Sequence, residues 1–200
     1  EINPLMKPCR TPGTDTIAEN LAGPDIRRGG GYSPVINFPR PGIAEFEPMG
    51  FHIDGTDVTT LWPGHRYMVL LAYLTDTCEH AGATAVRPGS HRVLFEHWQD
   101  TGTAPGGATS VPDLDFADAV PLPGSAGDVI FMHYLLAHGS SHNRSQRPRV
   151  ALNGVVAPHD DTPYDAKVGR PAPEWTPIDY SLRTDTLGIT RGSDLTFDGA

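Results

Sequence analysis

Two side chains of types that bind transition metals occur in a pattern that could begin a metal centre. His52 and Asp54 are two residues apart in the segment His52-Ile53-Asp54, and on a strand residues at this spacing project from the same face. An imidazole and a carboxylate would therefore converge on one point. A His-x-Asp pair is expected about once by chance in a chain of this composition, so its meaning depends on a third ligand.

His138 could supply that third ligand. Two imidazoles and one carboxylate form the facial set of non-haem Fe(II) sites, which leaves octahedral positions open for a bidentate cosubstrate and O₂. A structural zinc site would be closed by a fourth protein ligand, and a cupin-like zinc hydrolase is a further reading. His133 and His142 are the local competitors, although His133 should face away from position 138 on a regular strand.

Arg149 follows the candidate ligands near the start of a strand-like segment. Its planar guanidinium suits a carboxylate that must be held by two parallel hydrogen bonds. Ser140, two residues after His138, could add a hydroxyl donor from the same strand face. The plain alternative is that Arg149 forms an ion pair within the strand.

An ordered set of motifs resembles the phytanoyl-CoA dioxygenase family of Fe(II)/2-oxoglutarate oxygenases, which includes ectoine hydroxylase-like members. The specificity of the resemblance lies in the order of the whole set, which spans residues 33–157. The motifs are His52-x-Asp54, Arg87-Pro88-Gly89-Ser90-His91, Ala126-Gly127-Asp128, His138-Gly139-Ser140, Asn143-x-Ser145 and Arg149.

The resemblance implies a double-stranded β-helix that binds Fe(II), 2-oxoglutarate and O₂. His52, Asp54 and His138 would hold the iron, and Arg149 with Ser140 would hold the distal carboxylate of 2-oxoglutarate. Halogenases of this architecture carry a small residue at the carboxylate position. Asp54 therefore favours a hydroxylase over a halogenase.

Three further residues extend the candidate site. In ectoine hydroxylase-like members an Asn on a strand before the iron motif reaches the cosubstrate, and Asn37 in the segment Val35-Ile36-Asn37-Phe38 is similar. Phe51 and Trp62 flank the iron motif and are candidates for the wall of a substrate pocket. Packing in the core is the alternative for both aromatic residues.

The elements that must position these residues are short strands separated by turns, because the chain contains 22 Gly and 20 Pro. The pattern predicts an all-β antiparallel sandwich or barrel, such as a jelly roll, with a few short helices. The first helix would be capped by Thr14 or Asp15 and would bury Ile17 and Leu21; the second would follow Ser90. The predicted strands are 34–38, 43–47, 67–74, 83–87, 119–122, 129–134 and 149–156, with a two-turn helix as the rival for 67–74.

The composition describes one globular domain over residues 1–200, with 38% hydrophobic and 20% charged residues. The net charge of −9 argues against nucleic acid and anionic lipid as partners, although 129–159 contains three Arg and no acidic residue. No apolar run reaches the ~20 residues of a membrane helix. The start at Glu1 without a signal segment predicts a truncated N-terminus, with a cytoplasmic location as the default. Cys9 and Cys78 are too few for a disulfide framework.

The predicted function is an Fe(II)/2-oxoglutarate-dependent dioxygenase that hydroxylates an unactivated C–H bond of a small molecule and releases succinate and CO₂. The alternative is a non-catalytic β-sandwich module of the same fold that binds a metal or ligand. The chain contains only two Lys residues, which argues against a pocket for a CoA ester and favours a small metabolite or natural-product scaffold. Oligomeric state is left open.

Overall fold

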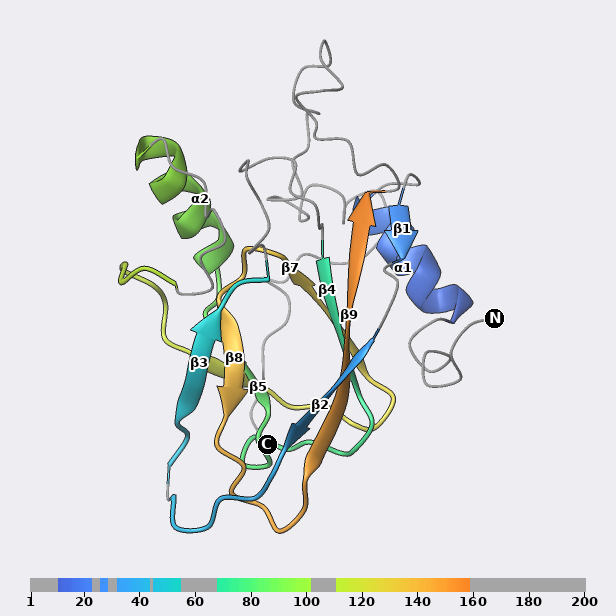
Figure 1. The fold of residues 1–200 in the computed structure, drawn as a ribbon, viewed down its shortest axis with the longest axis vertical. Helices are drawn as coiled ribbons and strands as arrows, with labels where there is room; N and C mark the ends of the chain where they lie inside the picture. Colours follow the sequence, from blue (N-terminus) through green and yellow to red (C-terminus); the bar gives the residue numbers. More distant parts are fainter. Residues whose placement is uncertain are drawn as a thin grey trace, which may run out of the picture.

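Two antiparallel sheets form the frame of the protein in a computed structural model that describes residues 11–22, 26–28, 32–43, 45–54, 68–101 and 111–158. One sheet has the order β1-β9-β4-β7, with β2 also paired to β9, and the other has the order β3-β8-β5-β6 (Figure 1). This is the predicted all-β, double-stranded architecture. The strands are β1 (Ile26–Arg28), β2 (Ser33–Asn37), β3 (Pro48–His52), β4 (Met68–Tyr73), β5 (Thr84–Val86), β6 (Val120–Leu122), β7 (Val129–His133), β8 (His138–Ser141) and β9 (Arg149–Pro158).

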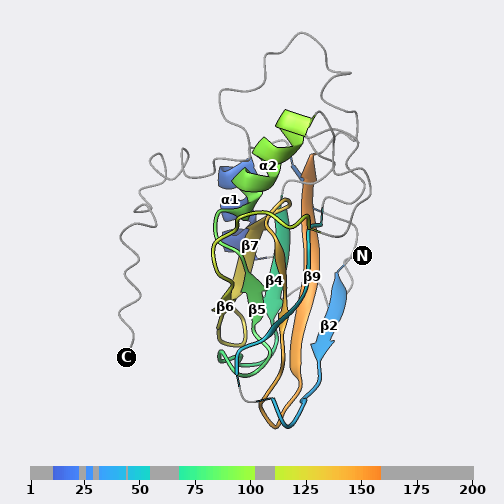
Figure 2. The same cartoon turned by 90° about the vertical axis from the view of Figure 1, so that its left-hand side faces the viewer.

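The central strand β4 is buried along its whole length. It pairs with β7 on one side and β9 on the other, so that Leu71 lies opposite both Ile130 and Asn153. The apolar residues Met68–Tyr73 therefore form a strand and not a helix. A core cluster that joins Val69 and Leu71 to Val86 of the opposite sheet fills the space between the two sheets. Figure 2 shows β2 beside β9 at one edge of the molecule.

Helix α2 (Ser90–Thr101) confirms the second predicted helix. Its apolar side packs on Phe51 and Ile53, on either side of His52, and on the turn between β7 and β8. The Ser90 hydroxyl accepts a hydrogen bond from the backbone N–H of Ala137 (2.9 Å). The helix is thereby fixed to the residue before His138. The buried members of this cluster are Ile53, Leu94, Trp98, Tyr134, Leu135 and Ala137.

Helix α1 (Pro12–Ala22) begins earlier than the sequence predicts. The hydroxyl of Thr11 accepts a hydrogen bond from the N–H of Thr14 (3.1 Å), so the cap is Thr11 and not Thr14 or Asp15. Proline suits the first helical position because its missing N–H has no intrahelical partner there. The buried face also differs from the predicted one, since Ile17 is 44% exposed and Ala18 is buried against Met68 and Leu70 of β4. The side chain of Leu21 lies outside the described residues.

The strand predicted over 43–47 is wrong, because the chain forms β3 after it, at Pro48–His52. Gly42 has a φ of +96°, so a turn separates β2 from the segment that follows. Strand β3 is irregular, with a bulge between Met49 and His52 that contains Gly50 at a φ of +59°. Strands β1 and β8 were not predicted. Within the described residues, neither helix is both long and apolar enough to cross a bilayer.

Candidate metal centre

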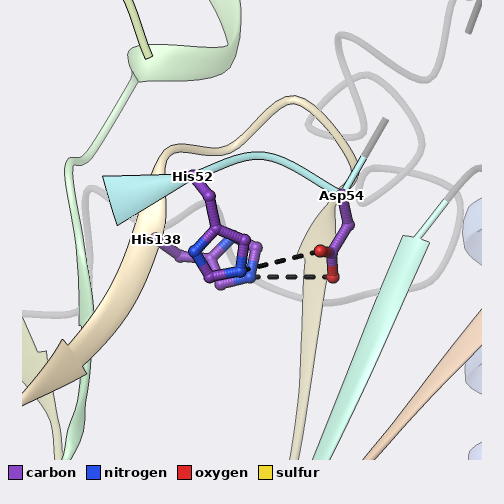
Figure 3. Close-up of side chains that lie close together, drawn as sticks. All are labelled: His52, Asp54 and His138. Atoms are coloured by element: carbon purple, nitrogen blue, oxygen red, sulfur yellow. Dashed lines mark ion pairs between the residues drawn. The ribbon is translucent and has the colours of Figure 1, made fainter. Parts of the chain in front are cut away.

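The three predicted metal ligands lie together at the end of β3 and the start of β8 (Figure 3). His52 and His138 are directly opposite in the antiparallel pairing of the two strands, and their ring centroids are 4.4 Å apart. Asp54 follows β3, and its two oxygens lie 3.7 Å from Nε2 of His52 and 3.7 Å from Nε2 of His138. The ligand atoms of all three residues lie within 4.8 Å of one another. This spacing places them around a single point.

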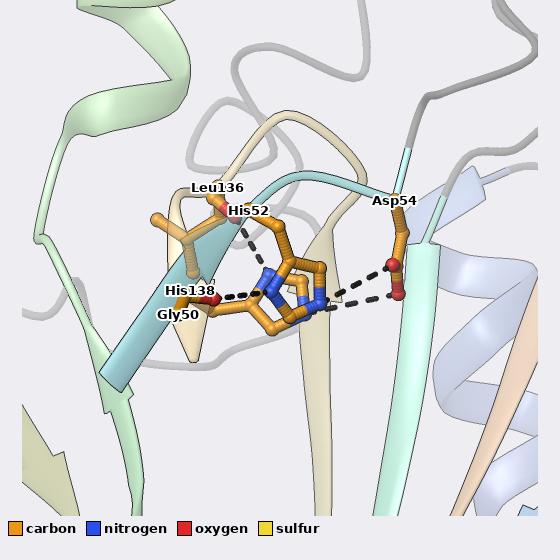
Figure 4. Close-up of polar contacts among 5 residues, drawn as sticks. All are labelled: Gly50, His52, Asp54, Leu136 and His138. Atoms are coloured by element: carbon orange, nitrogen blue, oxygen red, sulfur yellow. Dashed lines mark hydrogen bonds and ion pairs between the residues drawn. The ribbon is translucent and has the colours of Figure 1, made fainter. Parts of the chain in front are cut away.

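Backbone carbonyls fix the orientation of both imidazoles (Figure 4). Nδ1–H of His52 donates to the carbonyl of Gly50 (2.8 Å), and Nδ1–H of His138 donates to the carbonyl of Leu136 (2.8 Å). Since a carbonyl can only accept, each Nδ1 carries the proton and each Nε2 keeps its lone pair. Metal-bound histidines are held in this way by the nitrogen that does not bind the metal. The donor set therefore fits a divalent transition metal.

The two histidines differ in exposure. The side chain of His138 is 7% exposed, whereas that of His52 is 41% exposed. Burial lowers the pKa of His138, against the opposing effects of its hydrogen bond to Leu136 and the charge of Asp54. A lowered pKa keeps the imidazole neutral near pH 7, which is the form that binds metal.

A cavity of about 100 Å³ extends from the two histidines to Arg149 of β9. Arg149 is fully buried; its Nε–H donates to the carbonyl of Gly82 (3.0 Å), and its Nη2 donates to the hydroxyl of Ser140 (2.9 Å). Its Nη1 is buried and has no hydrogen-bond partner, and no carboxylate among the described residues is paired with it. Burial lowers the pKa of this guanidinium, but an arginine stays protonated at neutral pH. The cavity therefore presents an uncompensated positive charge and an open donor, which suits the carboxylate of a ligand.

The metal centre and the cavity beside it bring together five of the predicted site residues and leave the others apart. The five are His52, Asp54, His138, Ser140 and Arg149. Asn37 lines a separate groove with Arg40 and Met49, and its amide donates to the carbonyl of Ser141 (2.8 Å). Phe51 packs on the α2 cluster with the guanidinium of Arg87 4.9 Å above its ring. The predicted roles of Asn37 and Phe51 stay predictions. Trp62 lies outside the described residues.

Neither competitor for the third ligand belongs to the described centre. His133 ends β7 in the other sheet, opposite Met68, because the chain turns at 134–137 before β8 begins. His142 follows β8, and its Nε2 lies 4.0 Å from a carboxylate oxygen of Glu47. The regular strand that was assumed between His133 and His138 is interrupted.

Several residues that line the cavity between the sheets were not predicted from the sequence to belong to the site. One of them, Asn153, is four residues after Arg149 on β9. Strand periodicity places positions 149 and 153 on the same face, so this spacing could have identified it. The other missed lining residues are Val35, Val69, Leu71, Thr84 and Met132.

The chain belongs to the phytanoyl-CoA dioxygenase family, because the sequence profile of that family matches residues 10–151. That match contains His52, Asp54, His138 and Arg149. It confirms the resemblance inferred from the ordered motifs. No curated protein matches the chain in sequence.

Solved structures of non-haem oxygenases share the fold. EctD from S. alaskensis, crystallised with 2-oxoglutarate and 5-hydroxyectoine, has a TM-score of 0.54 and 20% identity, over 85% of this chain and 59% of EctD. SnoN, a non-haem α-ketoglutarate-dependent epimerase from nogalamycin biosynthesis, has a TM-score of 0.52 and 21% identity, over 80% of this chain and 63% of SnoN. The carbocyclase SnoK from the same biosynthesis has a TM-score of 0.51 and 22% identity, over 81% of this chain and 64% of SnoK. The chain thus spans less than two thirds of each of these proteins.

Proposed function

We propose that this protein is an Fe(II)- and 2-oxoglutarate-dependent dioxygenase that hydroxylates an unactivated C–H bond of a small molecule. In the balanced reaction, substrate, O₂ and 2-oxoglutarate give hydroxylated substrate, succinate and CO₂, with one oxygen atom of O₂ in each of the first two products. The observation that supports it is one cavity lined both by metal-ligand histidines and by a buried guanidinium with an unpartnered donor.

His52, Asp54 and His138 would hold Fe(II) with two neutral imidazoles and one carboxylate. Among the described residues, no fourth side chain completes this ligand set, which leaves coordination positions for a cosubstrate and O₂. Bound iron would supply the redox chemistry that couples decarboxylation of a 2-oxo acid to oxidation of the substrate.

Arg149 and Ser140 would bind the carboxylate of 2-oxoglutarate that is distant from the metal. The hydroxyl of Ser140 accepts a hydrogen bond from Nη2 of Arg149, so its own O–H remains a donor for the ligand. The buried guanidinium and the hydroxyl would thus fix one end of the cosubstrate, while the metal binds the other. Apolar side chains of Val69, Leu71 and Met132 line the cavity between these polar groups.

The type of oxidation that we propose is hydroxylation. Among the structural relatives, SnoN is an epimerase and SnoK a carbocyclase, and these reactions leave products of different mass from a hydroxylation. Asp54 as a carboxylate ligand supports hydroxylation over halogenation. The mass of the product distinguishes the outcomes, since hydroxylation adds one oxygen atom whereas epimerisation leaves the mass unchanged.

Anaerobic titration of the protein with Fe(II) and 2-oxoglutarate tests the proposal. A weak visible charge-transfer band is expected from the chelated 2-oxo acid in the wild type, and it should be absent in Asp54→Ala. Succinate release with candidate metabolites then identifies the substrate. If the wild type shows neither the band nor a thermal shift with metal and 2-oxoglutarate, the protein is the non-catalytic module. Activity with Zn(II) in the absence of O₂ would identify it as a hydrolase.

A further inference from the structure

Asn153 occupies a position in the cavity that folding alone does not explain. It lies in the middle of β9, opposite Ser33 of β2 and Leu71 of β4. It lines the same cavity as Arg149, His52 and His138. Because positions 149 and 153 share one face of the strand, the carboxamide is on the wall that continues from the guanidinium.

The carboxamide of Asn153 has no hydrogen-bond partner among the described residues. Its Oδ1 is buried and unpartnered, and the residues around it in the cavity include the apolar Val35, Val69 and Leu71. A buried polar group without a partner destabilises a fold, and an apolar residue of similar size would avoid that cost. The contacts within the protein therefore do not account for Asn at this position.

Arg149 repeats this pattern in the same cavity. Its Nη1 is also buried without a partner, so two strand positions on one wall present polar groups that the fold leaves unsatisfied. Unsatisfied groups of this kind in a native structure call for a ligand or an ordered water as the explanation. The two residues differ in charge, which allows their contributions to be separated by mutation.

We propose that Asn153 is a cosubstrate-binding residue that donates a hydrogen bond from its amide nitrogen to an oxygen of the bound 2-oxo acid. This inference rests on the proposed function. A 2-oxo dianion offers only acceptors, and the carboxamide has two N–H donors. A half-turn of the carboxamide exchanges its oxygen and nitrogen, so the enclosed position that Oδ1 holds in the ligand-free protein can present an N–H donor to a ligand in the cavity.

Binding of 2-oxoglutarate to the Mn(II)-loaded protein, measured by calorimetry, tests the inference without turnover. Asn153→Ala should weaken binding by about tenfold, the effect of one hydrogen bond to a charged group. Asn153→Asp should weaken it further, because a carboxylate has the same shape but no donor and repels the dianion. Neither substitution should change the affinity for Mn(II) alone.

The melting temperature of the ligand-free variants separates binding from a structural role. We expect Asn153→Leu, which keeps a side chain of similar size, to melt at the wild-type temperature or above it, since an unsatisfied group is removed. A clear fall in the melting temperature of Asn153→Leu, or wild-type affinity for 2-oxoglutarate in Asn153→Ala or Asn153→Asp, would overturn the inference alone. Failure of the wild type itself to bind 2-oxoglutarate would overturn the proposed function as well.

Discussion

Replacing Arg149 with Gln separates the stability of the fold from the binding of an acidic cosubstrate. The guanidinium of Arg149 makes two hydrogen bonds within the protein, to Gly82 and Ser140, each worth about 1.5–3 kcal/mol net because the donor is charged. Burying a charge without a carboxylate partner costs several kcal/mol, as an order of magnitude. These two effects oppose each other, so the ligand-free variant should unfold within about 1 kcal/mol of the wild type.

Binding should respond far more strongly than stability. Loss of two charge-assisted hydrogen bonds, at about 1.5–3 kcal/mol each, weakens 2-oxoglutarate binding by roughly 10²–10⁴-fold. At a cosubstrate concentration of about 100 times the wild-type Kd, the ligand stabilises the wild type by about 2.7 kcal/mol. This corresponds to a rise in Tm of roughly 5–11 °C for a chain of this size. A variant with a thousandfold weaker affinity should gain only about 0.1 kcal/mol.

Thermal unfolding with Mn(II), with and without 2-oxoglutarate, measures both quantities. Arg147→Gln is the matched control, because Arg147 is exposed two residues before Arg149. The Arg147→Gln control should keep the full rise in melting temperature that 2-oxoglutarate causes in the wild type. An undiminished shift in Arg149→Gln would refute the assignment of Arg149 as the carboxylate anchor. A loss of several kcal/mol in the ligand-free variant would refute the stability argument.

Two further predictions concern the metal centre. Because burial lowers the pKa of His138, the unfolded chain binds more protons than the folded chain near the ordinary His pKa of about 6.5. The metal-free protein should therefore lose stability as pH falls below about 6.5. In denaturant titrations, a His138→Gln variant should lose less stability over the same pH range. An equal loss in both proteins would show that His138 is not the source of the pH dependence. A side chain on Gly139 would collide with the backbone carbonyl of Met49 on the paired strand, so Gly139→Ala should destabilise the protein by about 2 kcal/mol or more and weaken metal binding in calorimetry. Gly13→Ala, where a Cβ meets only an ordinary contact at 3.7 Å, is the control, and equal effects of the two substitutions would refute the steric argument.

The strands that form the core could be predicted because their residues have strong β-propensity and clear boundaries. Met68–Tyr73 is wholly apolar and lies in an apolar run over 67–74 that is bounded by Arg66 and Thr75, and Val129–His133 follows a Gly-Asp turn. Their burial depends on local composition, so the pattern indicates it directly. The second helix was found for the same reason, since its apolar residues recur at helical spacing after Pro88-Gly89.

The strands that carry the candidate metal ligands could not be predicted in this way. Strand β8 reads His-Gly-Ser-Ser, which contains no residue with strong β-propensity, and β3 contains Pro48 and a left-handed Gly50. The order of the three candidate ligands along the chain still predicted a group that the fold brings together. Asn153 was missed although its spacing from Arg149 indicates a shared strand face, because the sequence does not show which cavity that face lines.

The weak β-propensity of β3 and β8 accompanies the geometry of the candidate metal centre. The two imidazoles come from directly opposed residues and have ring centroids 4.4 Å apart, and a Cβ at Gly139 would collide with the backbone of β3. The bulge at Gly50 also turns the carbonyl of that residue toward Nδ1 of His52. Residues that favour a regular strand would remove both features, so local preference and function conflict at this site, as expected where a fold is shaped by its chemistry. The buried core strands β4 and β9 stabilise the frame that holds the irregular pair in place.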